Sequence, residues 1–231
     1  MSLYVKILFW HLANSKKASD RSLSTFVRSI MIKLFYKKTI FPHYNASLLG
    51  IQNIFSKKTL HVGTVAHELS HRNDSTLLDI RGRMFIDSEF YHIGRGCRID
   101  VAENTELKIG KGGFINPFTN IIVRNGVTIG NDTYISWNCQ ILDEDYHEVS
   151  YDGRTEKDKK IEIGNHVWMG TGVSIYQGTK IADGCVVAAN SVVRGISKRK
   201  TASSAGIPQK SSKKISAGNN GKQTRHHYSV L

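Results

Sequence analysis

The sequence predicts a mainly β fold, a parallel solenoid whose coils have three flat faces. Aliphatic residues recur at every sixth position over long stretches, and a small or β-branched residue follows each of them four positions later. This period matches neither an α-helix nor the alternation of a strand in a flat sheet. It suits a coil with one hexapeptide per face and the aliphatic residue inside, so that backbone groups pair with the coils above and below.

The hexapeptide register can be followed residue by residue. The aliphatic positions of its longest unbroken run are Ile163, Met169, Ile175, Ile181, Val187 and Val193. The corresponding small positions are Val167, Val173, Thr179, Cys185 and Ser191. The register also holds at Ile129, Ile135 and Ile141, and it shifts by two residues upstream, which predicts a small loop at 124–126. All three cysteines, Cys97, Cys139 and Cys185, take the small position, so we expect them to fill the core.

The chain divides into three segments by pattern and charge. Residues 1–78 form a basic region expected to be a helical cap, 79–195 carry the repeat with a loop at 142–160, and 196–231 form a basic segment with a disordered end. Residues 1–60 contain ten Lys or Arg and one acidic residue, residues 194–231 contain nine and none, and the net charge is +13. Positive charge at both ends of an acidic body does not favour a continuous nucleic-acid groove.

The amino-terminal region contains one helical pattern, SLSTFVRSIMIKLFY, which Ser22 or Ser24 would cap. Its apolar stretches are too short or too charged to span a bilayer, so we expect a cytoplasmic protein. A basic, apolar-rich terminus suits peripheral contact with an anionic membrane at its inner face. A helical cap on the core is an equally good interpretation.

The motifs IGNDTYISWNCQI and IEIGNHVWMGTGVSIYQGTKIADGCVVAANSVV resemble those of the bacterial hexapeptide-repeat acyltransferases. The resemblance covers roughly residues 80–210 and is to the galactoside, maltose and capsular or exopolysaccharide O-acetyltransferases. It implies a left-handed parallel β-helix, a homotrimer with active sites between subunits, acetyl-CoA as co-substrate and a saccharide acceptor. No metal is implied.

The repeat breaks for about twenty polar residues between Ile141 and Ile163. His147 is the histidine in this break, and an imidazole suits removal of a proton from an attacking hydroxyl. The resemblance places the general base there. Asp143, Asp145 and Glu148 are candidates to orient its ring, with Asp145 preferred.

The segment around Asp143 also supplies candidate acceptor contacts, together with Trp137 and Asn138, although packing accounts equally well for the tryptophan. For acetyl-CoA the resemblance points to Gly170, Thr171, Ala188, Ala189, Arg194 and Lys198. Small residues let backbone N–H groups approach the ligand, and the basic residues would meet its phosphates. Hexapeptide corners require small residues in any case. The closing segment SSAGIPQK departs from the family pattern at Ile207 and Gln209.

Several other functions remain open at this stage. The same fold serves N-acetylation of amino sugars and acetylation of serine. A zinc hydratase would need three converging histidines, and the repeat offers His147 and His166, the latter interpreted as an exterior residue of a coil. A β-helix used as a scaffold would explain the repeat but not the polar break.

Overall fold

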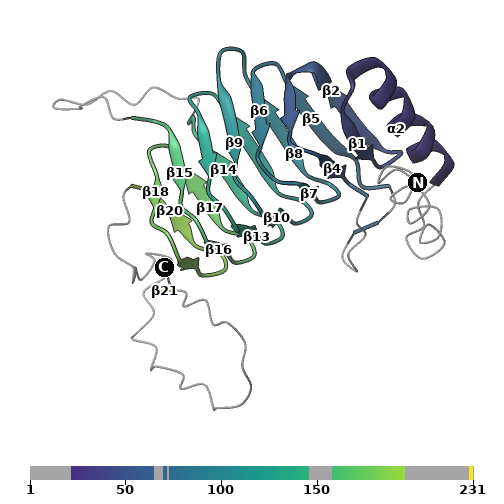
Figure 1. Cartoon of the computed structure of the whole chain (residues 1–231). Coiled ribbons are helices and arrows are strands. Elements are labelled where there is room, and N and C mark those ends of the chain that lie inside the picture. The colour runs from purple at the N-terminus through teal and green to yellow at the C-terminus, as the bar shows by residue number, and fades with distance from the viewer. Residues whose placement is uncertain (1–21, 65–69, 72, 146–157, 196–228, 231) are drawn as a thin grey trace.

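The computed structural model describes residues 22–64, 70, 71, 73–145, 158–195, 229 and 230. Figure 1 shows their strands winding around one axis, with the helix α2 (Ser22–Tyr36) at one end of the resulting prism. Successive strands join sheets A, B and C in turn, and neighbouring strands within each sheet are parallel. The described chain is therefore a three-faced parallel β-helix, as the hexapeptide period predicts.

The three sheets, A, B and C, form the three faces of the prism. Sheet A contains β1 (Thr39–Pro42), β4 (Thr59–Val62), β7 (Phe90–Ile93), β10 (Phe114–Ile115), β13 (Tyr134–Ile135), β16 (Trp168–Met169), β19 (Cys185–Val187) and β21 (Ser229–Val230). Sheet B contains β2 (Ala46–Leu49), β5 (Thr76–Ile80), β8 (Arg98–Val101), β11 (Asn120–Val123), β14 (Gln140–Leu142), β17 (Ser174–Tyr176) and β20 (Val192–Val193). Sheet C contains β3 (Ile54–Ser56), β6 (Arg83–Ile86), β9 (Glu106–Ile109), β12 (Val127–Ile129), β15 (Ile161–Ile163) and β18 (Lys180–Ile181), and a 3-10 turn (Ile51–Asn53) precedes β3.

The aliphatic residues of the repeat form continuous ladders inside the prism. In sheet A the register stacks Ile93, Ile115, Ile135, Met169 and Val187, and each of these side chains is buried. Consecutive residues of the six-residue period fall in sheets C, A and B in turn, because one hexapeptide spans one face. Every coil buries three such side chains against the coils on either side, which is the main source of its stability.

The small positions lie at the corners and are buried as well. Cys97, Cys139 and Cys185 are buried free thiols, which confirms their role in filling the core. The Cys139 Sγ lies 3.2 Å from the carbonyl oxygen of Gly170 on the next coil. Burial raises the pKa of Cys139 to about 11 and that of Cys97 to about 12. Both thiols are therefore protonated and unreactive at neutral pH.

The structure corrects the start of the solenoid. The predicted boundary is at residue 79, but β1 to β4 already belong to the three sheets, so the β-helix begins at Thr39. The first coils escaped detection because their connections differ in length and their inward row mixes Ile40, Leu60 and Tyr91, which breaks the hexapeptide spacing.

The helical pattern at the amino-terminal side is confirmed, since α2 spans Ser22–Tyr36. The helix ends at Lys37, whose φ of 56° is left-handed and whose N–H donates to the carbonyl of Lys33 at 3.1 Å. It covers the open end of the prism with Thr25, Ser29 and Ile32 turned inward. Among the described residues, this helix is too short and too polar to be a candidate for crossing a membrane.

The structure also bears on two smaller predictions, the bend at 124–126 and the end of the chain. Residues 124–126 form the predicted bend between β11 and β12, where the register shifts. At the other terminus, Ser229 and Val230 pair with Cys185 and Val186 as the last strand of sheet A. These two residues differ from the expected disordered end because they satisfy an otherwise unpaired edge. Residues 196–228 lie outside the described part.

Candidate active site

The predicted site residues lie along two corners of the prism, one on each side of sheet B. We call the corner between sheets A and B the A–B edge and the corner between sheets B and C the B–C edge. Connections from sheet A to sheet B include residues 136–139, 170–173 and 188–191, and those from sheet B to sheet C include 143–160 and 177–179. Arg194 follows β20 and also lies at the B–C edge.

The break in the repeat is at the B–C edge. Strand β14 ends at Leu142 and β15 begins at Ile161, which agrees with the loop expected at 142–160. His147 and Glu148 lie outside the described residues, as does Lys198. The structure describes the residues at both ends of this loop. Most of their contacts with the rest of the prism are made by three consecutive acidic residues, 143–145.

Asp143 holds the neighbouring connection in place. Its carboxylate is completely buried. Oδ1 accepts the backbone N–H of Arg124 at 2.6 Å, and Oδ2 accepts those of Asn125 at 2.8 Å and Gly126 at 2.6 Å. The bend at 124–126 thus presents its N–H groups to one anion in the manner of a backbone nest. The carboxylate that was predicted to contact a saccharide acceptor is thus buried and bound to this bend.

Glu144 joins the two ends of the loop. Its carboxylate accepts hydrogen bonds from the Lys159 ammonium at 3.1 and 2.8 Å, and Lys159 directly precedes the return to β15. The Asn125 side chain also donates to it at 3.3 Å. The hydrogen bond from Lys159 lowers the pKa of the Glu144 carboxyl. This ion pair joins the two described ends of the break.

Asp145 lies in a polar cluster with residues from the next two coils. Its Oδ2 accepts a hydrogen bond from Gln177 Nε2 at 2.5 Å, and Arg194 Nη2 lies 3.1 Å from Oδ1 and 3.2 Å from Oδ2. The Arg194 guanidinium carbon is 4.9 Å from the centroid of the Tyr176 ring. Charge-assisted hydrogen bonds and the ring contact together hold the last described residue before the loop against the coils that follow it.

At the A–B edge the predicted cofactor residues stack on one another. The Gly170 N–H donates to the carbonyl of Val187 at 2.9 Å, and the Asn190 N–H donates to the carbonyl of Thr171 at 2.8 Å. A Cβ at Gly170 would lie 2.6 Å from the backbone nitrogen of Ala189, so only glycine fits there. The structure thus brings Gly170 and Thr171 next to Ala188 and Ala189, with Thr171 and Ala189 exposed.

Trp137 and Asn138 continue this edge one coil earlier. The Trp137 carbonyl accepts the N–H of Gly172 at 2.9 Å, and Asn138 is exposed with a left-handed φ of 56°. Trp168 lies on the outer face of sheet A, where its indole N–H donates to the Ser136 hydroxyl at 3.3 Å. Small residues and one half-buried indole therefore follow one another along the A–B edge.

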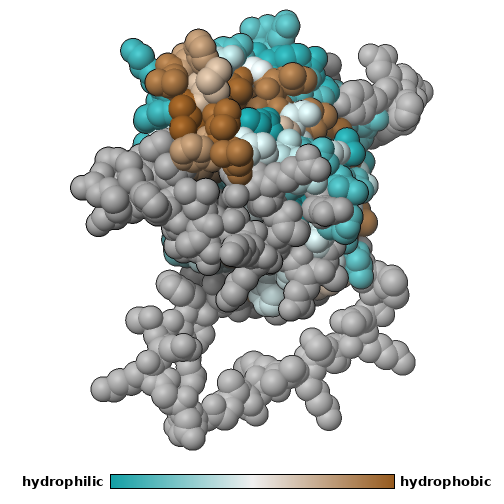
Figure 2. Space-filling view, turned by 90° about the vertical axis from the view of Figure 1, so that its right-hand side faces the viewer, coloured by the Kyte–Doolittle hydropathy of each residue, from teal (hydrophilic) through white to brown (hydrophobic). Residues whose placement is uncertain are grey.

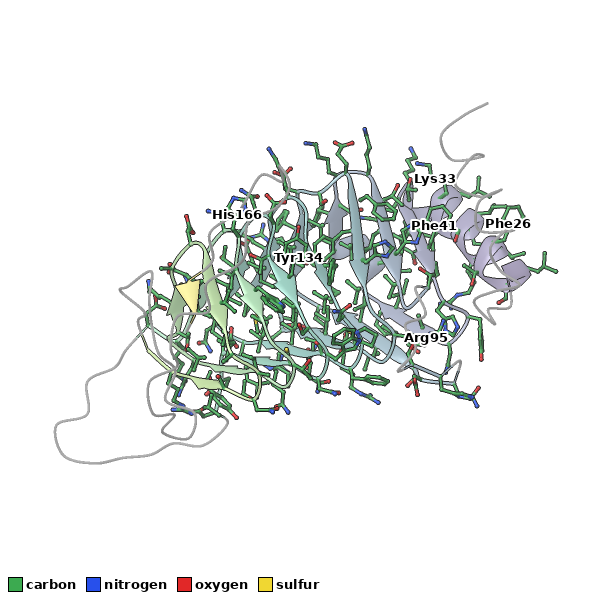
Figure 3. All side chains as sticks on the ribbon, turned by 90° about the horizontal axis from the view of Figure 1, so that it is seen from below. Phe26, Lys33, Phe41, Arg95, Tyr134 and His166 are labelled. Atoms are coloured by element: carbon green, nitrogen blue, oxygen red, sulfur yellow. The ribbon has the colours of Figure 1, made fainter. Side chains whose placement is uncertain are left out.

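The predicted site residues consequently fall into two groups that one chain does not bring together. Of the described residues predicted for acetyl-CoA, Gly170, Thr171, Ala188 and Ala189 lie at the A–B edge, whereas Arg194 lies with Asp145 at the B–C edge. His166 lies at the third corner, between sheets C and A, where its Nδ1 is 3.7 Å from Asp132 (Figure 3).

Glu144, Gln177 and Tyr176 were missed by the sequence analysis. Gln177 directly follows the last residue of β17, and Glu144 follows the last residue of β14 by two positions. The repeat carries no inward side chain at either position. The spacing of the repeat could have identified Gln177 and grouped it with Arg194. Ile141, Ile175 and Val193 are paired on three successive coils, and Gln177 follows Ile175 by two residues while Arg194 directly follows Val193. Both therefore lie at the same corner as the residues that follow Ile141.

Comparisons with known proteins agree with this architecture. The family of bacterial transferases with six hexapeptide repeats matches residues 160–195. The chain is 34% identical over 200 residues to an uncharacterized 24.8 kDa protein of the cps region of Klebsiella pneumoniae, which covers 85% of this chain and 89% of the relative. It is 33% identical over 137 residues to the putative lipopolysaccharide biosynthesis O-acetyl transferase WbbJ of Escherichia coli K12, covering 54% and 69% of the two chains.

A galactoside O-acetyltransferase of Escherichia coli K12 is 27% identical over 144 residues, which cover 59% of this chain and 70% of that enzyme. None of the solved structures matches the chain. In the described ranges, no three His, Cys, Asp or Glu side chains are grouped in a way that would hold a metal ion.

Proposed function

The chain belongs to the bacterial hexapeptide-repeat transferases and is an acyltransferase, and from this premise we propose that it transfers an acetyl group from acetyl-CoA to a hydroxyl of a saccharide. The proposed acceptor is a polysaccharide or its precursor. Two relatives carry names of O-acetyltransferases, one for lipopolysaccharide biosynthesis and one for galactosides, which favours oxygen over nitrogen as the acceptor atom.

One observation carries the proposed mechanism: the polar break between β14 and β15 contains, near its start, a residue that two later coils hold in place. Asp145 is bound by Gln177 and Arg194, and His147 follows two residues later. A general base must stand within hydrogen-bonding reach of the proton it removes, and an anchored loop satisfies that requirement better than a free one.

In the proposed reaction, the His147 imidazole accepts the proton of the acceptor hydroxyl while the oxygen attacks the thioester carbonyl. The tetrahedral intermediate then collapses, the bond between carbon and sulfur breaks, and the imidazolium returns its proton to the leaving thiolate. The products are the O-acetyl saccharide and free CoA. Direct transfer requires no nucleophile from the protein, which fits the three buried and protonated cysteines.

Acetyl-CoA is proposed to lie along the A–B edge, with its pantetheine arm beside Gly170, Thr171, Ala188 and Ala189. Arg194 and Lys198 are proposed to meet its phosphates, and Trp137 and Asn138 to contact the acceptor. Because Arg194 and the loop are at the B–C edge, this arrangement needs a homotrimer in which each site combines the loop of one subunit with the A–B edge of the next.

The first test measures release of the CoA thiol from acetyl-CoA with a panel of mono- and oligosaccharides, and compares the wild type with His147→Asn. A positioned general base contributes about two to four orders of magnitude, so we expect a loss of that size. His166→Asn is the matched control because it replaces the same residue type at another corner, where a left-handed φ of 53° tolerates asparagine. Its rate should equal that of the wild type.

Alternative acceptors are included in the same assay. Release with amino sugars or serine, but not with saccharide hydroxyls, would identify an N-acetyltransferase or a serine acetyltransferase. An unchanged rate in His147→Asn would exclude this residue from the mechanism. No release with any acceptor, together with no binding of CoA, would support the scaffold interpretation.

A further inference from the structure

The helix that closes the prism carries its large apolar side chains on the outside. Figure 2 faces this end of the molecule and shows a continuous hydrophobic area on its surface. The exposed side chains of α2 and their exposed fractions are Leu23 69%, Val27 49%, Met31 46%, Leu34 67% and Phe35 73%. Their spacing places them in one stripe along the length of the helix.

The opposite face of the same helix is small and partly polar. Thr25 and Ser29 are buried against the first coil, and the Ser29 hydroxyl donates to the Thr25 carbonyl at 2.7 Å. Arg28 ties the helix to the coil by donating to the carbonyls of His43 and Ala46. These polar contacts and the buried Ile32 hold the helix while its apolar stripe faces outward. An apolar surface of this extent on a folded chain marks an interaction site.

Positive charge lies directly beside the stripe. Lys33, Lys37, Lys38, Lys57 and Lys58 line a groove between the end of α2 and the first strands of sheet C. Lys57 and Lys58 are close to the carboxylate of Glu89, whereas the Lys33 ammonium donates to the Thr39 hydroxyl at 3.1 Å. The neighbouring acids Asp87 and Glu89 leave the groove with an excess of cations. The solenoid beyond residue 60 has the opposite balance up to residue 193.

We propose that this end of the prism docks on an anionic lipid bilayer. The stripe of α2 would enter the interface between headgroups and acyl chains, and the lysines would lie against lipid phosphates. An apolar face alone would suit a protein partner equally well. The cluster of lysines at its border selects a surface of dense negative charge, and a bilayer supplies both properties in one plane.

Docking through α2 would also set the distance between the bilayer and the candidate site. Figures 1 and 3 place α2, with Lys33, at the end of the prism far from His166 and the last strands. Strand β2 begins sheet B and β14 is the fifth strand of its order, so the loop after β14 lies roughly 20 Å along the axis at about 4.8 Å per strand. The site would then act on a saccharide that extends that far from the membrane. The docking proposal does not depend on acetyl transfer.

The test is flotation of the full chain with vesicles of phosphatidylcholine alone or mixed with phosphatidylglycerol. We expect binding to the mixed vesicles, little binding to phosphatidylcholine, and weakening at high salt. The double variant Leu34→Gln, Phe35→Gln should lose more than about tenfold in partition, because two large apolar side chains no longer enter the interface. Val192→Gln, at an exposed apolar site on the last coil, is the control and should bind as the wild type does.

The charge component is tested separately. Lys33→Gln and Lys37→Gln should each reduce binding to mixed vesicles about fivefold, whereas Lys108→Gln in the middle of sheet C should not. Failure of the wild type to float with mixed vesicles overturns the proposal, as does equal flotation with both kinds of vesicle. A larger assembly in solution that Leu34→Gln, Phe35→Gln dissociates also overturns it, since the stripe would then join copies of the chain. Acetyl transfer to a soluble acceptor, measured in the same variants, should remain unchanged.

Discussion

The two edges of sheet B are built in opposite ways. At the A–B edge, coils approach so closely that Gly170 has no room for a side chain beneath Ala189, and successive coils present backbone and small side chains. At the B–C edge, carboxylates of three consecutive residues bind the bend at 124–126, the returning end of the loop and the two coils that follow. The first edge is a regular product of the repeat. The second is a network of individual polar contacts that interrupts it.

The difference separates two ways of building a surface on one fold. A regular edge repeats the same backbone and small side chains from coil to coil, so its shape depends little on any single side chain. An irregular edge can hold one loop in one position, and this ability depends on every member of its network. The predictions below test this contrast.

The largest expected effect comes from a test of whether the two edges that form one site belong to different subunits. His147→Asn at one edge and Ala189→Trp at the other should each lower acetyl transfer by about two orders of magnitude or more. If each site combines the loop of one chain with the A–B edge of its neighbour, random mixed trimers should regain about a quarter of the wild-type rate. Steady-state thiol release after co-expression measures this recovery.

The control for this experiment mixes the same two variants after they have been purified and assembled separately. Without exchange of subunits, no recovery is expected. Absence of recovery in the co-expressed trimers as well would place the complete site within one chain, contrary to the arrangement proposed.

The next effect concerns stability at the B–C edge. Asp143→Asn places an amide where three backbone N–H groups need an acceptor, so we expect a loss of about 2 to 3 kcal/mol in the free energy of unfolding. Asp132→Asn removes the same charge from an exposed position and should change stability by less than about 0.5 kcal/mol. Denaturant unfolding compares the two. Equal losses would mean that the nest around Asp143 contributes nothing specific.

A smaller effect is expected from the Asp145 cluster. Arg194→Gln removes the ion pair with Asp145, and we expect kcat to fall about tenfold because the start of the loop loses one of its two anchors. Gln177→Ala should act in the same direction. Lys180→Gln, which removes a cation paired with Glu162 near the same edge, serves as the control.

The kinetic pattern distinguishes the two proposed roles of Arg194. A change confined to the KM for acetyl-CoA would assign Arg194 to the phosphates of the cofactor alone. A fall in kcat at saturating acetyl-CoA would support its role in positioning the loop.

The smallest effect is a pH dependence of the loop ends. Lys159 lowers the pKa of Glu144 below its ordinary value of 4.5, so the pair stabilises the fold above that value and its contribution is lost as the pH falls through the lowered pKa. Both side chains are partly exposed, which keeps the effect small. Thermal unfolding between about pH 3 and 6 should therefore show a slightly steeper acid loss in the wild type than in Glu144→Gln. Parallel curves would contradict this assignment.

Much of the fold could be predicted because the core of a β-helix is local in sequence. Each aliphatic residue from Ile163 to Val193 repeats after one face, so the period alone predicts three parallel sheets and the buried cysteines. The helix Ser22–Tyr36 was predicted from its own pattern. The first coils, from Thr39, were not, because connections of unequal length conceal the period. The left-handed winding came only from the family resemblance.

The sequence by itself determined that this protein is a three-faced parallel β-helix with one polar interruption, since burial of one residue in six is a local property of the chain. The tertiary structure decided which corner each candidate residue occupies. It separated Gly170 and Ala189 from Asp145, joined Asp145 to Gln177 and Arg194 on later coils, and turned Asp143 inward to bind a backbone bend. These relations depend on the stacking of coils that are about 20 to 50 residues apart, and elementary spacing becomes informative about them only after the coils are aligned.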